Sequence, residues 1–123
     1  DYVTIQTTGN ATDFGDLTIA RNRLAACSDA TRGVFGGGYT DSYSNVLDYV
    51  TIQTAGNATD FGDLTAARSA LAACSDATRG VFGGGTTGSY TNVLDYVTIQ
   101  TAGNATYFGD LTAARRGLAA CSA

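Results

Sequence analysis

The chain repeats one stretch of 47 residues almost three times. The first copy covers residues 1–47, and the sequence restarts at Asp48 and again at Asp95. The first two copies are identical at 40 of 47 positions, and the third matches the second at 25 of 29. A period of this length is typical of solenoids, propellers and arrays, whose units bury their apolar faces against their neighbours. The repeat therefore constrains the fold more strongly than any local motif does.

Each unit contains four short runs with the composition of β-strands. In the second unit these runs are 71–75, 80–85, 93–99 and 105–111. They are rich in β-branched, aromatic or small apolar residues, and glycines and polar turn residues separate them. Four strands in a unit of about 40–50 residues are typical of a β-propeller blade. The alternative is one short helix per unit, over the alanine-rich residues 66–73.

We interpret residues 1–123 as a segment of one repeat domain. Its units are 1–47, 48–94 and a partial third, 95–123. In the frame of the strands, two full blades cover approximately residues 24–64 and 71–111. Two outer strands precede them and a lone first strand follows, which makes eleven predicted strands. A propeller closes with about four to eight blades. We therefore expect a segment of a larger ring.

Composition excludes several classes of function. The chain has seven Arg, eleven Asp, no His and a net charge of −4, which argues against nucleic-acid binding. Without His, Ser-His-Asp and Cys-His catalysis and His-based metal sites are excluded in these residues. No apolar run approaches the length of a membrane span. We predict a protein without catalytic activity, metal or cofactor.

Several residues recur once per unit and have structural interpretations. They are Cys27, Cys74 and Cys121; Asn10, Asn57 and Asn104; and Arg21, Arg68 and Arg115. An odd number of cysteines at a fixed spacing is no disulfide framework, so we expect stacked, small buried residues. The asparagines belong to formal glycosylation sequons, and we interpret them as turn residues between the third and fourth strands. We expect the arginines to bond backbone carbonyls or an Asp of the adjacent blade.

The pattern of the unit resembles the kelch repeat. The features that carry the resemblance are Val81-Phe-Gly-Gly-Gly85, Tyr96, Phe108 and Arg115. The unit departs from the kelch pattern because Phe14, Phe61 and Phe108 stand where kelch repeats usually have Trp. The resemblance implies a kelch-like β-propeller of four-stranded blades. Some kelch-type propellers house a copper oxidase site built on histidines, so no catalytic residue is carried over to this chain.

The sequence of the repeat is also similar to repeat arrays in tail-fibre and structural proteins of marine bacteriophages. The phrases that carry this resemblance are GNATDFGDLT and TRGVFGGG. It implies an extracellular or virion location, in an appendage that attaches to a host.

The copies differ mainly in two kinds of loop. Six of the seven differences between the first two copies lie in the loop between strands two and three or in the connection between blades. In a propeller these loops share one face. Loop drift is one explanation, and a diversified binding face is the other. Our candidate binding residues are Arg23, Tyr39, Asp41, Tyr43, Tyr90 and Arg116. Such aromatic and charged side chains suit a glycan or a protein surface.

The sequence thus predicts a non-catalytic structural and recognition module that binds a host-surface glycan or protein. The alternative is a purely structural repeat that forms a filament or surface array and has no specific ligand. A third reading, an enzyme with its catalytic residues outside these 123, has no support in the sequence. In the first two readings, further copies of the repeat, in the same or neighbouring chains, are expected partners.

Overall fold

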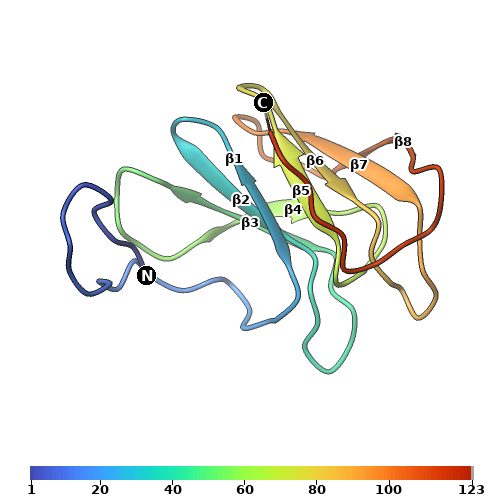
Figure 1. Cartoon of the computed structure of the whole chain (residues 1–123), viewed down its shortest axis with the longest axis horizontal. Helices are drawn as coiled ribbons and strands as arrows, with labels where there is room; N and C mark the ends of the chain where they lie inside the picture. Colours follow the sequence, from blue (N-terminus) through green and yellow to red (C-terminus); the bar gives the residue numbers. More distant parts are fainter. Residues whose placement is uncertain (123) are drawn as a thin grey trace.

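The computed structural model describes residues 1–122 and places two four-stranded antiparallel sheets side by side (Figure 1). The first sheet contains β1 (Ala25–Ser28), β2 (Arg32–Gly36), β3 (Val46–Thr51) and β4 (Thr59–Asp63). The second contains β5 (Ala72–Ser75), β6 (Arg79–Gly83), β7 (Val93–Thr98) and β8 (Thr106–Asp110). In both sheets the strands follow chain order.

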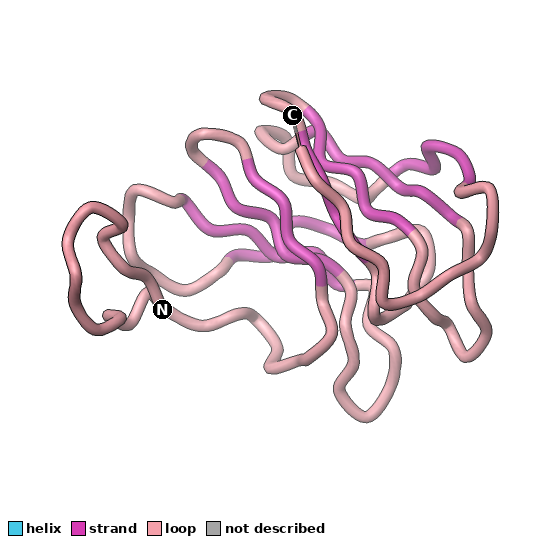
Figure 2. The backbone as a smooth tube through the Cα atoms, viewed as in Figure 1, coloured by secondary structure: helices cyan, strands magenta, loops and turns pink. Residues whose placement is uncertain are grey.

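The prediction of an all-β fold is confirmed, since residues 1–122 contain strands and loops but no helix (Figure 2). The alternative of a helix over residues 66–73 is wrong, because this stretch is a turn that runs into β5. It also follows that the described residues hold no helix able to cross a membrane.

The two sheets have the same register, shifted by one repeat. In the first sheet the pairing of β3 with β4 slips between Leu47 and Asp48, and in the second it slips between Leu94 and Asp95. A β-bulge of this kind bends a strand and redirects a side chain. Both aspartates at the bulge are fully buried, and they organise the site described below.

The sheets contact each other through their inner strands, β1 and β5. Serines one repeat apart link the inner strands: the Ser75 hydroxyl donates to the Ser28 carbonyl at 2.7 Å. The Ser75 amide donates to the hydroxyl of Ser122 at 2.8 Å. The apolar core includes Val34, Leu47, Phe61, Leu64, Leu71, Phe82, Val97 and Ile99. The second sheet therefore depends on the first for much of its burial.

The structure corrects the expected strand count, because residues 1–122 form eight strands and not eleven. Residues 1–24 contain no strand and only two isolated bridges, from Tyr2 to Thr12 and from Asn22 to Tyr39, and residues 118–122 are not in a strand. A strand is stabilised by a ladder with a neighbour. The terminal stretches have no adjacent inner strands in the described chain to complete such a ladder.

Candidate functional site

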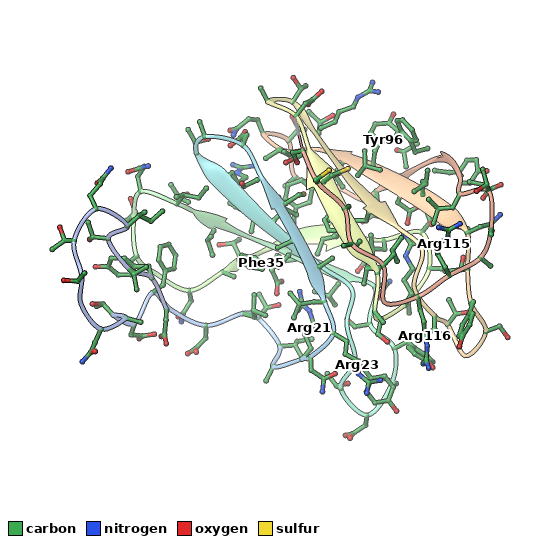
Figure 3. The ribbon with its side chains drawn as sticks, in the orientation of Figure 1. Arg21, Arg23, Phe35, Tyr96, Arg115 and Arg116 are labelled. Carbon is green, nitrogen blue, oxygen red and sulfur yellow. The ribbon has the colours of Figure 1, made fainter. Side chains whose placement is uncertain are left out.

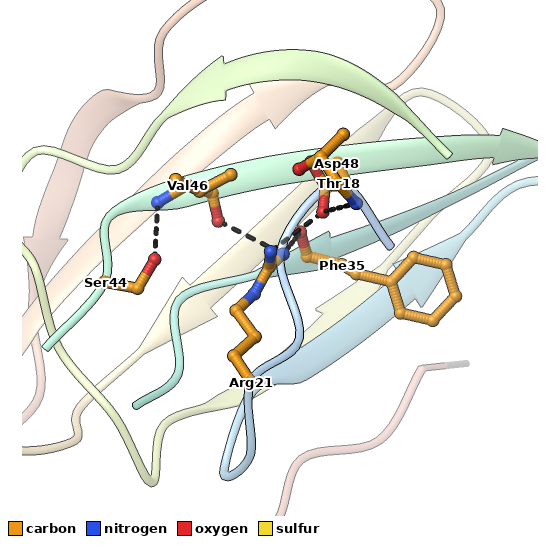
Figure 4. A network of polar contacts seen from close by, with 6 residues as sticks. All are labelled: Thr18, Arg21, Phe35, Ser44, Val46 and Asp48. Carbon is orange, nitrogen blue, oxygen red and sulfur yellow. Dashed lines mark hydrogen bonds and ion pairs between the residues drawn. The ribbon is translucent and has the colours of Figure 1, made fainter. Parts of the chain in front are cut away.

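A buried ion pair anchors the connection that leads into the first sheet (Figure 4). Arg21 Nη1 donates to Asp48 Oδ2 at 2.8 Å, and its Nη2 donates to the Phe35 carbonyl at 3.3 Å. Thr18 Oγ1 donates to Asp48 Oδ1 at 2.6 Å. The β3 bulge thus holds the connection in place just before β1.

The same arrangement recurs one repeat later and ties the two sheets together. Arg68, on the connection from β4 to β5, donates from Nη2 to Asp95 Oδ2 at 3.0 Å and to the Phe82 carbonyl at 3.2 Å. Thr65 Oγ1 donates to Asp95 Oδ1 at 2.7 Å. Burial lowers the pKa of Arg68, and the charge of Asp95 opposes that shift. The prediction that these arginines bond an Asp or a carbonyl is confirmed for Arg21 and Arg68.

The third copy of this arginine is in a different environment. Arg115 is exposed, and its Nε donates to the carbonyl of Ala113, two residues away, at 3.3 Å. No aspartate of residues 1–122 forms a salt bridge with Arg115 within 4.0 Å. Arg115 has the same position in the repeat as Arg68, but among residues 1–122 no third sheet lies beside it as the second sheet lies beside Arg68.

The anchored connections bring variable positions of all three units into contact. The amide of Ala70 donates to the carbonyl of Arg23 at 2.8 Å, and the amide of Gly117 donates to the carbonyl of Ala70 at 2.8 Å. These three residues all adopt positive φ, at 55°, 55° and 64°. The neighbouring Asn22 exchanges backbone bonds with Tyr39, at 3.0 and 2.8 Å, and thereby joins the connection to the β2–β3 loop.

We call this part of the surface the variable-loop face. It comprises the loops 37–45 and 84–92 and the connections 19–23, 66–70 and 113–117. Figure 3 shows Arg23 and Arg116 on the same edge of the molecule, below the two sheets. The loops that differ between copies therefore meet on one edge.

Two of the candidate residues from the first unit contact each other on this face. The rings of Tyr39 and Tyr43 meet edge to face, with centroids 5.3 Å apart and an interplanar angle of 71°. Both tyrosines are half-buried, whereas Arg23 and Asp41 are exposed. The first unit thus contributes a packed pair of tyrosines and two exposed charges of opposite sign to this face.

The remaining two candidates also contact each other on the same face. The guanidinium of Arg116 lies over the ring of Tyr90, 5.2 Å from its centroid. The ring of Tyr90 is 58% exposed. A cation above an exposed aromatic ring keeps that ring oriented. The structure therefore shows two side-chain contacts among the six predicted residues, Tyr39 with Tyr43 and Arg116 with Tyr90.

The opposite face has contacts that the sequence analysis did not anticipate. Gln100 Nε2 donates to Asp29 and, at 2.7 Å, to Thr31 Oγ1, and Arg32 Nη1 donates to the Ile99 carbonyl at 3.0 Å. These bonds cross from the first sheet to the second. The hydrogen bond from Gln100, together with those from the backbone amides of Thr31 and Arg32, lowers the pKa of Asp29 to about 2. The only available signal was that residues 28–32 are identical in the second copy.

The three cysteines occupy the same position in the repeat but differ in burial. Cys27 is buried, Cys74 is half-buried and Cys121 is exposed. Burial, followed by the neighbouring Cys74, raises the pKa of the Cys27 thiol to about 12. The expectation of buried cysteines is thus right for Cys27 and wrong for Cys121, which has no adjacent sheet to cover it. Within residues 1–122 no cluster of His, Cys, Asp and Glu is suited to hold a metal ion.

Comparison with models of known protein families and with curated proteins finds no match to this chain. Its class is therefore defined by the fold and the site alone. It is an all-β tandem-repeat protein in which buried Arg–Asp pairs anchor the connection that precedes each four-stranded sheet.

Proposed function

We propose that the chain is a non-catalytic structural and recognition module, a segment of a kelch-like propeller that binds a host-surface glycan. The observation that carries the proposal is the gathering of the variable positions on one face. In a binding protein, diversified residues are expected on the surface that meets the ligand. The constant residues then form the scaffold, and the variable ones form the contact surface.

The chemistry of the variable-loop face supports a sugar as the ligand. An exposed aromatic ring, such as that of Tyr90, offers a flat apolar surface for the C–H face of a pyranose and a hydroxyl at its edge. Arg116 lies over the ring of Tyr90, and Arg23 and Asp41 are exposed on the same face; these side chains can donate to or accept from sugar hydroxyls. A protein surface is the second kind of partner that such residues suit.

The wider setting of the proposal depends on the two resemblances of the sequence. Strands in chain order, with the inner strands of adjacent sheets in contact, support the arrangement of propeller blades. The bacteriophage-like phrases support an extracellular or virion location, in an appendage that contacts the host.

The second copy of the repeat supplies a variant that tests the proposal. Arg23→Ala, Tyr39→Thr and Asp41→Gly together give the first unit the residues that the second unit carries at Ala70, Thr86 and Gly88. The fold should tolerate them, because the second sheet already does. On a glycan array we expect this triple variant to lose binding by roughly tenfold or more.

The matched control is Thr8→Ala, which also converts a residue of the first unit to that of the second but lies outside the variable-loop face. Its binding should equal that of the original chain. Equal loss in both variants would contradict a site on the variable-loop face. Binding to host proteins but not to glycans would replace the sugar by a protein ligand.

A specific observation favours the alternative, a structural repeat with no ligand. Asp29, Thr31 and Arg32 on the opposite face make bonds between the sheets, and these bonds alone would keep that face constant. The variable-loop face would then differ between copies only because it is less constrained. Absence of any binding by the original chain would favour this alternative.

A further inference from the structure

The contact between the two sheets includes a short set of backbone bonds near β4. The amide of Gly103 donates to the Phe61 carbonyl at 2.7 Å, and the amide of Ala105 donates to the Asp63 carbonyl at 2.8 Å. The Asp63 amide donates to Asn104 Oδ1 at 3.0 Å. These bonds join the outer edge of one unit to the β-turn of the next.

The same set occurs one repeat earlier, although residues 1–17 contain no strand. The amide of Gly56 donates to the Phe14 carbonyl at 2.7 Å, and the amide of Ala58 donates to the Asp16 carbonyl at 2.8 Å. The Asp16 amide donates to Asn57 Oδ1 at 3.0 Å. The contact thus forms between consecutive units wherever both of its halves are present.

One half of this contact is exposed at each end of the chain. At the C-terminal end, Phe108 and Asp110 stand where Phe61 and Asp63 stand in the internal contact. Phe108 is 52% exposed, whereas Phe61 is 3% exposed. At the N-terminal end, Gly9, Asn10 and Ala11 are exposed and stand where Gly103, Asn104 and Ala105 stand.

The partners of the polar contacts between the sheets also have counterparts at the ends of the chain, one partner at each end. Arg115 and Thr112 are exposed at one end, and Asp1, the counterpart of Asp95, is exposed at the other. Gln6 is the counterpart of Gln100, and Asp76 is that of Asp29. Each end therefore presents charges and hydrogen-bonding groups that complement those of the other end.

An apolar groove lies on the first sheet. The corresponding surface of the second sheet is covered by the first sheet. It has a volume of about 460 Å³, and Leu24, Phe35, Val50 and Ile52 contribute to its lining. On the second sheet the counterparts of the last three, Phe82, Val97 and Ile99, are buried, with exposures of 0%, 3% and 0%. The groove is thus the uncovered form of a surface that an adjacent unit covers elsewhere in the same molecule.

We infer that the C-terminal end of one copy docks on the N-terminal end of a second copy, head to tail. Phe108 and Asp110 would bond Gly9, Asn10 and Ala11 of the second copy, and residues 118–122 would enter the groove as an inner strand. The two copies do not compete for a place, because residues 1–17 correspond to the outer strands β7 and β8, and residues 118–122 correspond to β5. Neither end supplies a counterpart of β6, so residues 118–122 would be held by packing against β1 of the second copy, as β1 packs against β5 within the chain.

The contact joins two different surfaces, so it is heterologous and each copy keeps one end open. Such contacts produce rings or open filaments rather than closed twofold dimers. The inference does not depend on the variable-loop face, and it holds whether or not that face binds a glycan.

The test is the mass of the 123-residue chain in solution, measured by sedimentation from about 1 µM to about 1 mM. The weight-average mass should rise with concentration to at least twice the 12.6 kDa of one copy. A tail-blocked variant, Phe108→Asp, and a head-blocked variant, Asn10→Arg, should each stay monomeric. An equimolar mixture of the two should form dimers and nothing larger, because each retains one usable end.

The control is Tyr90→Ser, which removes a ring as exposed as that of Phe108 but lies on the variable-loop face; it should associate like the original chain. Arg115→Asp is a second tail-blocked variant for the case that Phe108→Asp does not fold, as judged by circular dichroism. A chain that is monomeric at every concentration would overturn the inference. Association of either blocked variant alone, or a mixture that stays monomeric, would also overturn it.

Discussion

The contact between the sheets and the C-terminal end of the molecule contain the same residues in different surroundings. Phe61 is 3% exposed at the contact, and Phe108, one repeat later, is 52% exposed. Arg68 is buried and paired with Asp95, whereas Arg115 is exposed. Since the local sequences are nearly identical, the neighbouring sheet decides which copy of a side chain is buried.

The difference has an energetic consequence. Burying a Phe side chain contributes about 1.5–3 kcal/mol relative to leaving it exposed, and repeat proteins derive much of their stability from such contacts between units. The same substitution should therefore have unequal effects at the contact and at the end. Four pairs of measurements compare the two regions, each made on dilute protein so that any association of copies is negligible.

The largest difference is expected between Arg68→Ala and Arg115→Ala. Arg68→Ala leaves Asp95 buried without its counter-charge, so it should lower the free energy of unfolding by about 3–5 kcal/mol. Arg115→Ala alters an exposed side chain and should change it by less than about 0.5 kcal/mol. Urea unfolding measures both, and equal losses would contradict the comparison.

The cysteines should differ strongly in their reaction with a thiol reagent. Cys27 is buried and its pKa is raised to about 12, while Cys121 is exposed. Because the thiolate is the reactive species, Cys27 should react only when the structure opens locally. At pH 8 we expect Cys121 to be modified roughly 100-fold faster or more. Mass spectrometry of timed samples gives both rates, and similar rates in folded protein would refute the expectation.

A smaller difference is expected between two glycines with similar backbone conformations. Gly62 and Gly109 have φ of +144° and +157°, so Ala is strained at either position. A Cβ at Gly62 would lie 2.4 Å from the carbonyl oxygen of Gly103, whereas a Cβ at Gly109 would meet nothing within 4 Å. Gly62→Ala should therefore destabilise the chain by about 1–3 kcal/mol more than Gly109→Ala. Thermal unfolding of the two variants checks this, and an equal cost would show that the clash is relieved.

The smallest difference concerns pH. The hydrogen bond from Gln100 and the backbone bonds nearby lower the pKa of Asp29 from 3.8 to about 2. A lowered pKa in the folded state stabilises the fold above pH 4, and this contribution is lost as the pH falls from about 4 to about 2. Since the carboxylate is near solvent, we expect less than about 1 kcal/mol.

Its control is Asp76, whose pKa is also lowered, mainly by the backbone bonds of Arg79 and Thr78, with no Gln partner. Asp29→Asn should flatten the loss of stability between pH 4 and pH 2 more than Asp76→Asn does. Urea midpoints across this range measure both slopes. A steeper effect at Asp76 would contradict the role of Gln100.

The elements of the fold were predictable because they depend on local patterns. The four runs of the second unit anticipated β5 to β8 within one or two residues at most ends, since turn glycines and β-branched residues act over short distances. An Asp or carbonyl partner for Arg68 was also predictable. That the partner is Asp95 was not, because the bulge in β7 that redirects it has no sequence signal.

The candidate site was predictable in its grouping and not in its contacts. Propeller geometry placed the variable loops on one face, and the structure brings their positions together through Arg23, Ala70 and Gly117. The stacking of Arg116 on Tyr90 depends on rotamers and loop shape. The Gln100–Asp29 bond spans 71 residues, and nothing in either segment indicates the other.

The sequence by itself determined the repeat, the strands and their order, because hydrophobic period and turn residues act within a few neighbours. Only the tertiary structure decided which copy of each residue became core. Phe61 and Phe108, like Arg68 and Arg115, have nearly the same local sequence context, but one of each pair has a sheet beside it. Burial depends on atoms far along the chain, so identical stretches take different roles wherever their neighbours differ.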